Sequence, residues 1–426
     1  MTALEPRALS VAMVLCALGA AGSARAEGAA ASSPAPMIEG LRFSGFLQAD
    51  AVLYRQSARD EINSATREPL NTQRFSIPRA RLRADFERGP VAAALELDAN
   101  TLNGPAARIL DAEITGRWQG RDPKAPPYLA LTIGLLKIPF GLEVPQAETS
   151  RLFLERSATA QAFFPGVYDL GIRVHGGYRF LRYSAALMNG DPIGEKGFGG
   201  LDLTASKDVI ARLGVDTRPV AAVRVEVGIS GLTGQGLHPG TPATKDVLVW
   251  RDANEDGLVQ STEIQAIPGA AATPSEPFRR FALAADLRVT ATIPVLGELA
   301  IYGEIARAQN LDRGVEPADP VSVGRDMREL GFYAGFTQEL TRWAMVGLRY
   351  DRYNPDADAS EQRGVVRVPR DSTYATVAAT AAFRWTPLLR VIAEYQHHQN
   401  ALGRSTGGLP TTLGDDLFAL RGEVKF

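Results

Sequence analysis

The strongest constraint on this chain is an alternation of apolar and polar residues that recurs along most of its length. In residues 74–87, RFSIPRARLRADFE, Leu82 and Phe86 fall on the opposite face from Arg81 and Arg83, because a β-strand points successive side chains to opposite sides. The sequence therefore predicts an all-β fold. About sixteen segments show this pattern, at 41–54, 74–87, 91–100, 108–118, 128–138, 169–179, 181–189, 207–216, 220–230, 279–290, 297–308, 329–339, 343–353, 373–384, 388–398 and 416–426.

The connections between these segments alternate between short and long. Most segments are close to the 9–11 residues that a tilted strand needs to cross a bilayer. Strands that run up and down through a membrane, with short turns on one side and long loops on the other, produce this alternation. We therefore expect a transmembrane, 16-stranded antiparallel β-barrel over 41–426, with short periplasmic turns and long extracellular loops, in the outer membrane of a bacterium. A soluble β-sandwich is the alternative, and one-sided long loops fit it poorly.

Aromatic residues cluster at the ends of the predicted strands. One set meets the short turns and another meets the long loops, and two such sets indicate girdles at the two membrane interfaces. The final strand also ends on an aromatic residue, as outer-membrane barrels commonly do. The first set is Trp118, Tyr128, Tyr178, Trp343, Trp385 and Phe426, and the second is Tyr54, Tyr168, Tyr353 and Tyr374.

The N-terminal residues are typical of a secretory signal. Residues 1–26 contain a basic start at Arg7, an apolar run over 9–22 and a small-residue cleavage site that ends at Ala26. Residues 27–40 are predicted to be a linker, rich in small residues. The single cysteine, Cys16, lies in the signal, so we expect the exported chain to have neither a disulfide nor a thiol nucleophile. A formal net charge of −2 gives no basic excess for binding nucleic acid.

The orientation of the arginine stripe follows from the energy of burying charge in lipid. Arg79, Arg81 and Arg83 lie on one face of residues 74–87. Each would cost about 2–4 kcal/mol on the lipid side near the membrane midplane, so we expect all three to face the lumen. Two interpretations of this lining remain open. The arginines either pair with lumenal carboxylates across strands, or they form a path for anions.

The third long loop, 139–168, is predicted to fold inward and narrow the lumen. It contains Arg151 and Arg156, and Lys137 directly precedes it. Arg173 follows the loop and faces the lumen by strand parity. These four residues therefore join the arginine stripe as candidates for an anion path.

Four motifs lie in or beside this loop, namely KIPFGLE (137–143), ERS (155–157), FFPGVYDLGIR (163–173) and ALMNGDP (186–192). Together they resemble the phosphate-selective porin O and P family. The resemblance implies a homotrimeric outer-membrane channel for the passive diffusion of small anionic solutes such as phosphate or polyphosphate. It also implies that lumenal Arg79, Arg81, Arg83 and Lys137 contact the anion. A general, weakly selective porin is the alternative within this class.

The longest predicted external loop, 231–278, contains the sequence DANEDGLVQSTE at 252–263. Hard oxygen ligands occur at the spacing of a twelve-residue calcium loop, with Gly257 at the sharp turn. We therefore predict a structural Ca²⁺ that stiffens this loop, while an acidic surface turn without metal remains the alternative. The predicted ligands are Asp252, Asn254, Asp256, the Leu258 carbonyl, Gln260 and Glu263.

No enzymatic motif is found in the sequence. There is no nucleophile elbow, phosphate-binding loop or paired zinc spacing. The adjacent His397 and His398 would point apart on a strand, so they do not indicate a metal site. We expect a protein without catalytic activity. The rival to a channel is a surface interaction protein, anchored by the barrel and using the calcium-type loop to bind a partner.

Overall fold

A computed structural model of the chain describes residues 39–56, 61–102, 106–120, 122, 125–194, 204–363, 365–404 and 409–426. The predicted signal peptide (1–26) and most of the predicted linker (27–38) lie outside the described residues. The barrel belongs to the compact unit Gly40–Phe426.

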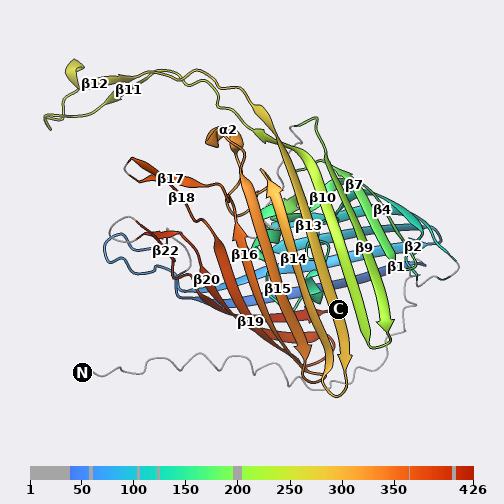
Figure 1. Ribbon diagram of the computed structural model, residues 1–426. Coiled ribbons are helices and arrows are strands. Elements are labelled where there is room, and N and C mark those ends of the chain that lie inside the picture. The colour runs from blue at the N-terminus through green and yellow to red at the C-terminus, as the bar shows by residue number, and fades with distance from the viewer. Residues whose placement is uncertain are drawn as a thin grey trace, which may run out of the picture. The chain divides into compact units, whose positions relative to one another are not determined.

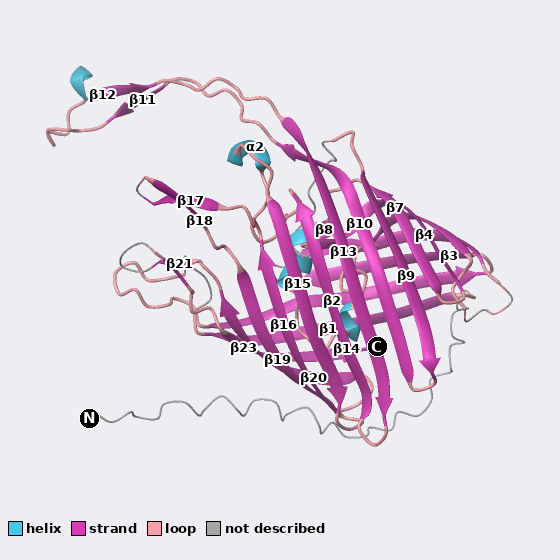
Figure 2. Cartoon of the chain, in the orientation of Figure 1, coloured by secondary structure: helices cyan, strands magenta, loops and turns pink. Residues whose placement is uncertain are grey.

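Sixteen antiparallel strands form a closed barrel (Figures 1 and 2), which confirms the predicted fold class. Each strand pairs with its neighbours in the chain, and β1 closes the sheet by pairing with both β2 and β23. The barrel strands are β1 (Leu41–Tyr54), β2 (Gln73–Arg88), β3 (Val91–Asn100), β4 (Ala106–Trp118), β5 (Leu129–Lys137), β6 (Gly166–Tyr178), β7 (Leu181–Met188), β9 (Asp208–Val220), β10 (Val223–His238), β13 (Glu276–Ile293), β14 (Gly297–Gln309), β15 (Arg328–Glu339), β16 (Ala344–Asn354), β19 (Tyr374–Arg384), β20 (Leu389–Gln399) and β23 (Leu417–Lys425).

Short elements decorate the loops. Among the described residues, none of the helices has both the length and the hydrophobicity that crossing a bilayer requires. Strand β8 (Ile193–Gly194) pairs with β6. Three small hairpins are β11 (Val247–Trp250) with β12 (Ile264–Ile267), β17 (Ser360–Arg363) with β18 (Val366–Pro369), and β21 (Gly403–Arg404) with β22 (Pro410–Thr411). The helices in the described part of the chain are α1 (Ala158–Phe163), α2 (Pro320–Val323) and the 3₁₀ turns η1 (Glu148–Ser150) and η2 (Ser261–Glu263).

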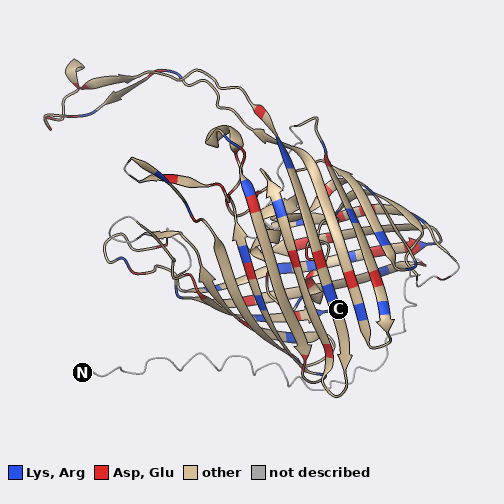
Figure 3. Cartoon of the chain, viewed as in Figure 1, with Lys and Arg blue, Asp and Glu red and all other residues tan. Residues whose placement is uncertain are grey.

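The two faces of the barrel wall differ as the alternation predicts. On β14, Ile301 and Ile305 are 53% and 64% exposed on the outer face, whereas Ala300 and Ala306 are buried inside. On β2, Leu82 points outward, and Arg81 is buried on the lumenal side. Figure 3 shows charged residues of both signs along the strands. An apolar outer face is what a strand needs in order to contact lipid.

The structure corrects the predicted borders of the longest loop. Strand β10 runs to His238 and pairs with β13 from Val223↔Ala291 to His238↔Glu276, so the loop spans 239–275 and not 231–278. The sequence underestimates β10 because its last part, Gly231–Gly236, is rich in glycine and polar residues. Backbone pairing defines a strand, and it continues where the side chains no longer need to be apolar.

The predicted aromatic girdle beside the long loops is wrong. Tyr168 and Tyr353 are 2% and 0% exposed inside the barrel. The Tyr353 hydroxyl donates to Asp312 Oδ2 at 2.6 Å, and the Tyr374 hydroxyl donates to Glu316 Oε1 at 2.8 Å. Both carboxylates come from the loop between β14 and β15. A buried tyrosine needs a partner for its hydroxyl, and these loops supply one.

We predict that charge on the outer face destabilises the barrel. Leu348 lies at the middle of β16 and is 44% exposed on the outer face. Leu348→Arg should lower the free energy of unfolding by about 2–4 kcal/mol, because the guanidinium must enter hydrocarbon. Urea titration of the protein in phospholipid vesicles measures this change.

The matched control is Leu248→Arg in the β11–β12 hairpin, where the leucine is 70% exposed. This exposed loop change should alter the free energy of unfolding by no more than about 0.5 kcal/mol. Equal effects of the two substitutions would contradict the assignment of the outer face to lipid.

Candidate functional site

The segment between β5 and β6 folds into the barrel, as the sequence predicts. It carries η1 and α1, and its apolar side chains are almost fully buried. Phe140 and Phe164 stack with ring centroids 5.2 Å apart, and Phe163 meets Tyr353 of β16 edge-on at 6.0 Å. This apolar cluster joins the loop to the inner side of the barrel wall.

Side chains of the opposite wall bind the backbone N–H groups of this loop. Gly141 N donates to Ser230 Oγ on β10 at 3.0 Å, and Leu142 N donates to Glu304 Oε2 on β14 at 2.8 Å. A buried loop must find such partners for its polar groups. Gly141 has a φ of +65°, and a Cβ added there would lie 2.3 Å from Glu304 Oε1. Only glycine therefore fits this contact.

Further along, the loop binds β16, β20 and β23. Leu154 N donates to Glu394 Oε2 at 2.9 Å. Arg349 Nη1 donates to the Glu155 carbonyl at 2.9 Å, and Lys425 Nζ donates to the Thr149 carbonyl at 2.8 Å. The loop is therefore held at several points along its length, which fixes its position across the lumen.

The loop leaves two cavities beside the wall formed by the first strands. One has a volume of about 510 Å³ and reaches Phe426, and the other has a volume of about 720 Å³ and reaches Tyr54 near the long loops. Arg81, Glu148 and Tyr168 line both cavities, so the two cavities meet at these side chains. This junction lies between η1 of the loop and the wall made by β2 and β6.

The three stripe arginines face the lumen and bind carboxylates there. Arg79 Nη2 donates to Glu155 Oε2 of the inward loop at 2.8 Å. Arg81 bonds Glu96 and Asp98 of β3, both at 3.3 Å. Arg83 Nη1 donates to Asp111 Oδ2 of β4 at 2.7 Å and also reaches Glu96. The stripe thus lies within a network of ion pairs, as the cross-strand pairing interpretation describes.

Glu148 collects three guanidinium groups at the junction of the cavities. Its carboxylate contacts Arg151 and Arg156 of the same loop, and Arg79 Nε lies 3.8 Å away. Arg151 is 6% exposed, and its Nε and Nη1 bond no other group among the described residues. Arg79 is paired mainly with Glu155, so Arg151 and Arg156 share the single carboxylate of Glu148 and leave a small excess of positive charge around it.

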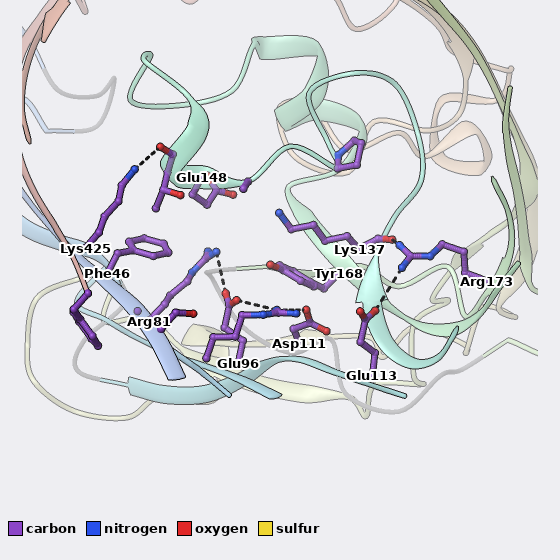
Figure 4. A pocket seen from close by; sticks show the side chains of 17 residues that line it. Phe46, Arg81, Glu96, Asp111, Glu113, Lys137, Glu148, Tyr168, Arg173 and Lys425 are labelled. Carbon is purple, nitrogen blue, oxygen red and sulfur yellow. Dashed lines mark hydrogen bonds and ion pairs between the residues drawn. The ribbon is translucent and has the colours of Figure 1, made fainter. Parts of the chain in front are cut away.

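Lys137 and Arg173 line the cavity of about 510 Å³ (Figure 4). Lys137 Nζ donates to the Gln146 carbonyl at 3.0 Å and lies 5.6 Å from the centre of the Tyr168 ring. Arg173 Nη2 lies 3.6 Å from Glu113 Oε2. Figure 4 shows Lys137 and Tyr168 near each other, across the cavity from Lys425. Among the described residues, no carboxylate bonds Lys137.

The structure therefore brings all seven candidate anion-path residues to the lumen, in two groups. Arg79, Arg151 and Arg156 surround Glu148, whereas the other four line the cavity that reaches Phe426. Sequence reasoning missed Glu148 and the wall residues that bind the loop, such as Glu304 and Glu394. Strand parity places the wall carboxylates inside, but no sequence signal shows that they bind the loop backbone.

The calcium-type loop forms the tip between β11 and β12. Gly257 has a φ of +72°, and its N–H donates to Asp252 Oδ2 at 2.8 Å. Glu263 accepts from Trp250 Nε1 and Ala253 N, both at 3.1 Å. Across the described residues, no three carboxylate, imidazole or thiol groups converge to hold a metal ion. The backbone turn fits a calcium loop, but the side chains of Asp252, Asp256 and Glu263 do not gather around one point.

Several solved outer-membrane proteins have the same fold. OprB of Pseudomonas putida, in a high-pH structure, is 13% identical, with a TM-score of 0.56 over 91% of this chain and 94% of that one. OmpT of Vibrio cholerae, in a trimer form, is 10% identical, with a TM-score of 0.53 over 91% and 99%. An anion-selective porin of Comamonas acidovorans is 10% identical, with a TM-score of 0.51 over 90% and 98%.

No protein-family model matches the chain, and no curated protein matches it. The likeness to solved structures therefore establishes the fold and does not extend to the phosphate-selective family. A closed barrel of this fold with an apolar outer face is a protein of the bacterial outer membrane.

We predict that the ion pair between Glu155 and its arginines stabilises the barrel down to low pH. Burial of the Glu155 carboxylate raises its pKa, but the positive charges of Arg79 and Arg421 outweigh this effect and hold the pKa well below its ordinary value. A lowered pKa stabilises the folded state above the unfolded pKa of about 4.3. That stabilisation is lost as pH falls through the lower folded pKa. The Glu155→Gln variant should lack this stabilisation.

The measurement is the free energy of unfolding of wild type and Glu155→Gln between pH 2 and 7. The difference should be constant above about pH 5 and shrink below about pH 4. Glu61→Gln is the control, since its pair with Arg74 is partly exposed and should contribute no more than about 1 kcal/mol. A difference between wild type and Glu155→Gln that does not change with pH would contradict the prediction.

Proposed function

We propose that this chain is an outer-membrane porin that passes small hydrophilic solutes by passive diffusion, with a modest preference for anions such as phosphate. The observation that supports it best is the inward loop, bound along its length to the wall of a sixteen-stranded barrel. Sixteen strands enclose space for an aqueous channel, whereas eight are enough for an anchor. A loop fixed inside such a barrel sets the size of the passage. The proposed activity is passage without catalysis.

The modest preference follows from the charges that line the two cavities. Nine basic side chains face seven acidic side chains, which is a small positive excess in a chain whose net charge is −2. The basic side chains are Arg74, Arg79, Arg81, Arg83, Lys137, Arg156, Arg173, Arg421 and Lys425. The acidic side chains are Asp50, Glu96, Asp111, Glu113, Glu148, Glu155 and Asp191.

An anion that passes the junction would exchange part of its hydration for these cations. Arg151 and Arg156 share the carboxylate of Glu148, and Arg156 lines one of the cavities. Lys137 adds a cation that no described carboxylate bonds. Most other lumenal arginines are already paired, so their attraction for a passing anion is weakened. A general porin with weak selectivity is therefore the nearest alternative.

We further propose that the protein forms a homotrimer. The support is a structural neighbour described in a trimer form, OmpT of Vibrio cholerae. Analytical ultracentrifugation of the protein in detergent tests this proposal, and a monomeric mass would contradict it.

We predict opposite shifts in ion selectivity from two substitutions in the lumen. Lys137→Gln should lower the ratio of anion to cation permeability, and Glu148→Gln should raise it. Each change is expected to be about two- to fivefold, as for interactions of roughly 0.5–1 kcal/mol in a hydrated site. The measurement is the reversal potential of single channels in a planar bilayer under a KCl gradient, repeated with phosphate.

Lys245→Gln in an exposed external loop is the matched control and should leave the reversal potential unchanged. Wild-type channels that favour cations would overturn the anion preference and leave a general porin. An absence of any conductance would overturn the channel itself and favour the barrel-anchored surface protein.

Calcium binding by the external loop is a separate proposal. The turn at Gly257 and the Asp252–Gly257 hydrogen bond support a loop that closes on Ca²⁺, which would stiffen 252–263 at the cell surface. Calorimetry should detect binding with a Kd of about 10⁻⁴–10⁻³ M, typical of extracellular sites. Asp252→Asn/Asp256→Asn should abolish the heat. No binding by wild type at about 10 mM Ca²⁺ would end the proposal.

The surface-protein alternative draws support from the same hairpin. Leu248 and Val259 are 70% and 67% exposed there. Deleting residues 240–270 separates the two functions. Loss of adhesion to cells with unchanged conductance would support the alternative, whereas unchanged adhesion would contradict it.

A further inference from the structure

A line of arginines lies on the outer face of the barrel near the long loops. Four consecutive strands each carry one within four residues of this end, namely β13, β14, β15 and β16. Figure 3 shows basic residues at these ends of β13, β14 and β15. The four residues, called the outer arginine line, are Arg279, Arg307, Arg328 and Arg352.

Strand parity places these side chains outside the barrel. Arg307 is exposed between buried Ala306 and Ala308, and Arg352 is exposed between Asp351 and Tyr353, which are 2% and 0% exposed. Arg279 is exposed beside Arg280, whose guanidinium turns inward.

Nearby carboxylates neutralise part of the positive charge of the outer arginine line. Arg328 bonds Asp358, and Arg352 lies near Asp371. The guanidinium groups of Arg279 and Arg307 bond no side chain among the described residues. An outward arginine near the membrane interface destabilises the barrel less than one at the midplane, but contact with hydrocarbon does not stabilise it. Because no described carboxylate neutralises Arg279 and Arg307, this part of the line favours an anionic partner.

Below the line, the outer face holds an apolar groove of about 860 Å³. Small residues make the hollow, since Ala211 and Gly231 face outward beside the larger Leu283 and Ile305. Arg307 lines one end of the groove, because it pairs in register with Leu283 on one side and Leu330 on the other. The groove and the arginine therefore form one continuous surface.

We propose that this surface binds an acidic lipid of the outer leaflet, with a phosphorylated headgroup on the outer arginine line and an acyl chain in the groove. Guanidinium groups bind phosphate oxygens through paired hydrogen bonds. The groove lies on the face that contacts lipid, where an acyl chain fills an apolar hollow without loss of hydrogen bonds. A free phosphate ion would use the arginines and leave the groove empty, so the combination points to a lipid.

The test is titration of the full-length barrel in detergent with diphosphoryl lipid A, followed by native mass spectrometry. Arg307→Gln should weaken binding about fivefold, and Arg279→Gln/Arg307→Gln about 25-fold, as expected for basic residues near a lipid surface. Arg55→Gln is the matched control, because Arg55 is exposed beside the same end of β1 on another part of the wall. It should bind like wild type.

A second variant tests the groove without changing charge. A Cβ at Gly231 would meet Leu283 at an ordinary distance of 3.5 Å, so Gly231→Leu can fill the hollow while β10 keeps its pairing. This variant should also weaken lipid binding, about fivefold. Each variant is checked for folding by detergent gel electrophoresis, in which the folded barrel of an unheated sample migrates differently from the unfolded chain of a heated sample.

Four outcomes would overturn the proposal. The first is equal lipid binding by wild type and the double arginine variant. The second is equal binding of phosphorylated and fully dephosphorylated lipid A by wild type. The third is displacement of the lipid by inorganic phosphate at a phosphate concentration equal to that of the lipid. The fourth is dissociation of an oligomer by Gly231→Leu, which would assign the groove to a second copy of the chain. None of these depends on conductance, so the proposal can fail while the channel stands.

Discussion

The structure depends on one requirement, which is that every backbone N–H and C=O in a lipid environment must find a partner within the protein. Sixteen strands meet it only because the last pairs with the first, with Leu47 opposite Val424 in the closing ladder. Closure then divides all side chains into two sets. The outer set must suit lipid, and the inner set is free to be polar. The alternation in the sequence is the direct consequence of this division.

The same requirement acts on the loop inside the barrel. Its backbone groups lie away from bulk water, and the wall satisfies them with side chains such as Ser230, Glu394 and Arg349. Many lumenal charges are therefore structural, because they hold the loop in place. Charges with this role are not fully available to a solute. This explains how a lumen rich in arginine can have only a small excess of positive charge, concentrated around Glu148 and Lys137.

The outer face shows that lipid contact does not make a surface uniform. Many outward positions carry leucine, isoleucine or valine, but small residues at Ala211 and Gly231 open a groove beside Arg307. A membrane is apolar in its middle and charged at its surface, so a position near a strand end can carry an arginine that its middle cannot. The depth of an outward position in the membrane thus determines whether a charged side chain is tolerated there.

The sequence by itself determined the class of the fold, the strand number and the lumenal side of Arg79, Arg81 and Arg83, because a period of two and the cost of charge in lipid are local properties. It predicted the strands within a few residues, except where polar and glycine residues continue β10 to His238. Only the tertiary structure decided which carboxylate meets which arginine and where the inward loop is bound. Contacts such as Glu155 with Arg421 join residues far apart in the chain. Their pairing depends on barrel closure and loop position, which no local pattern encodes. The side chains of Tyr168 and Tyr353 are buried in the lumen for the same reason, because loops that fold into the barrel pack against them.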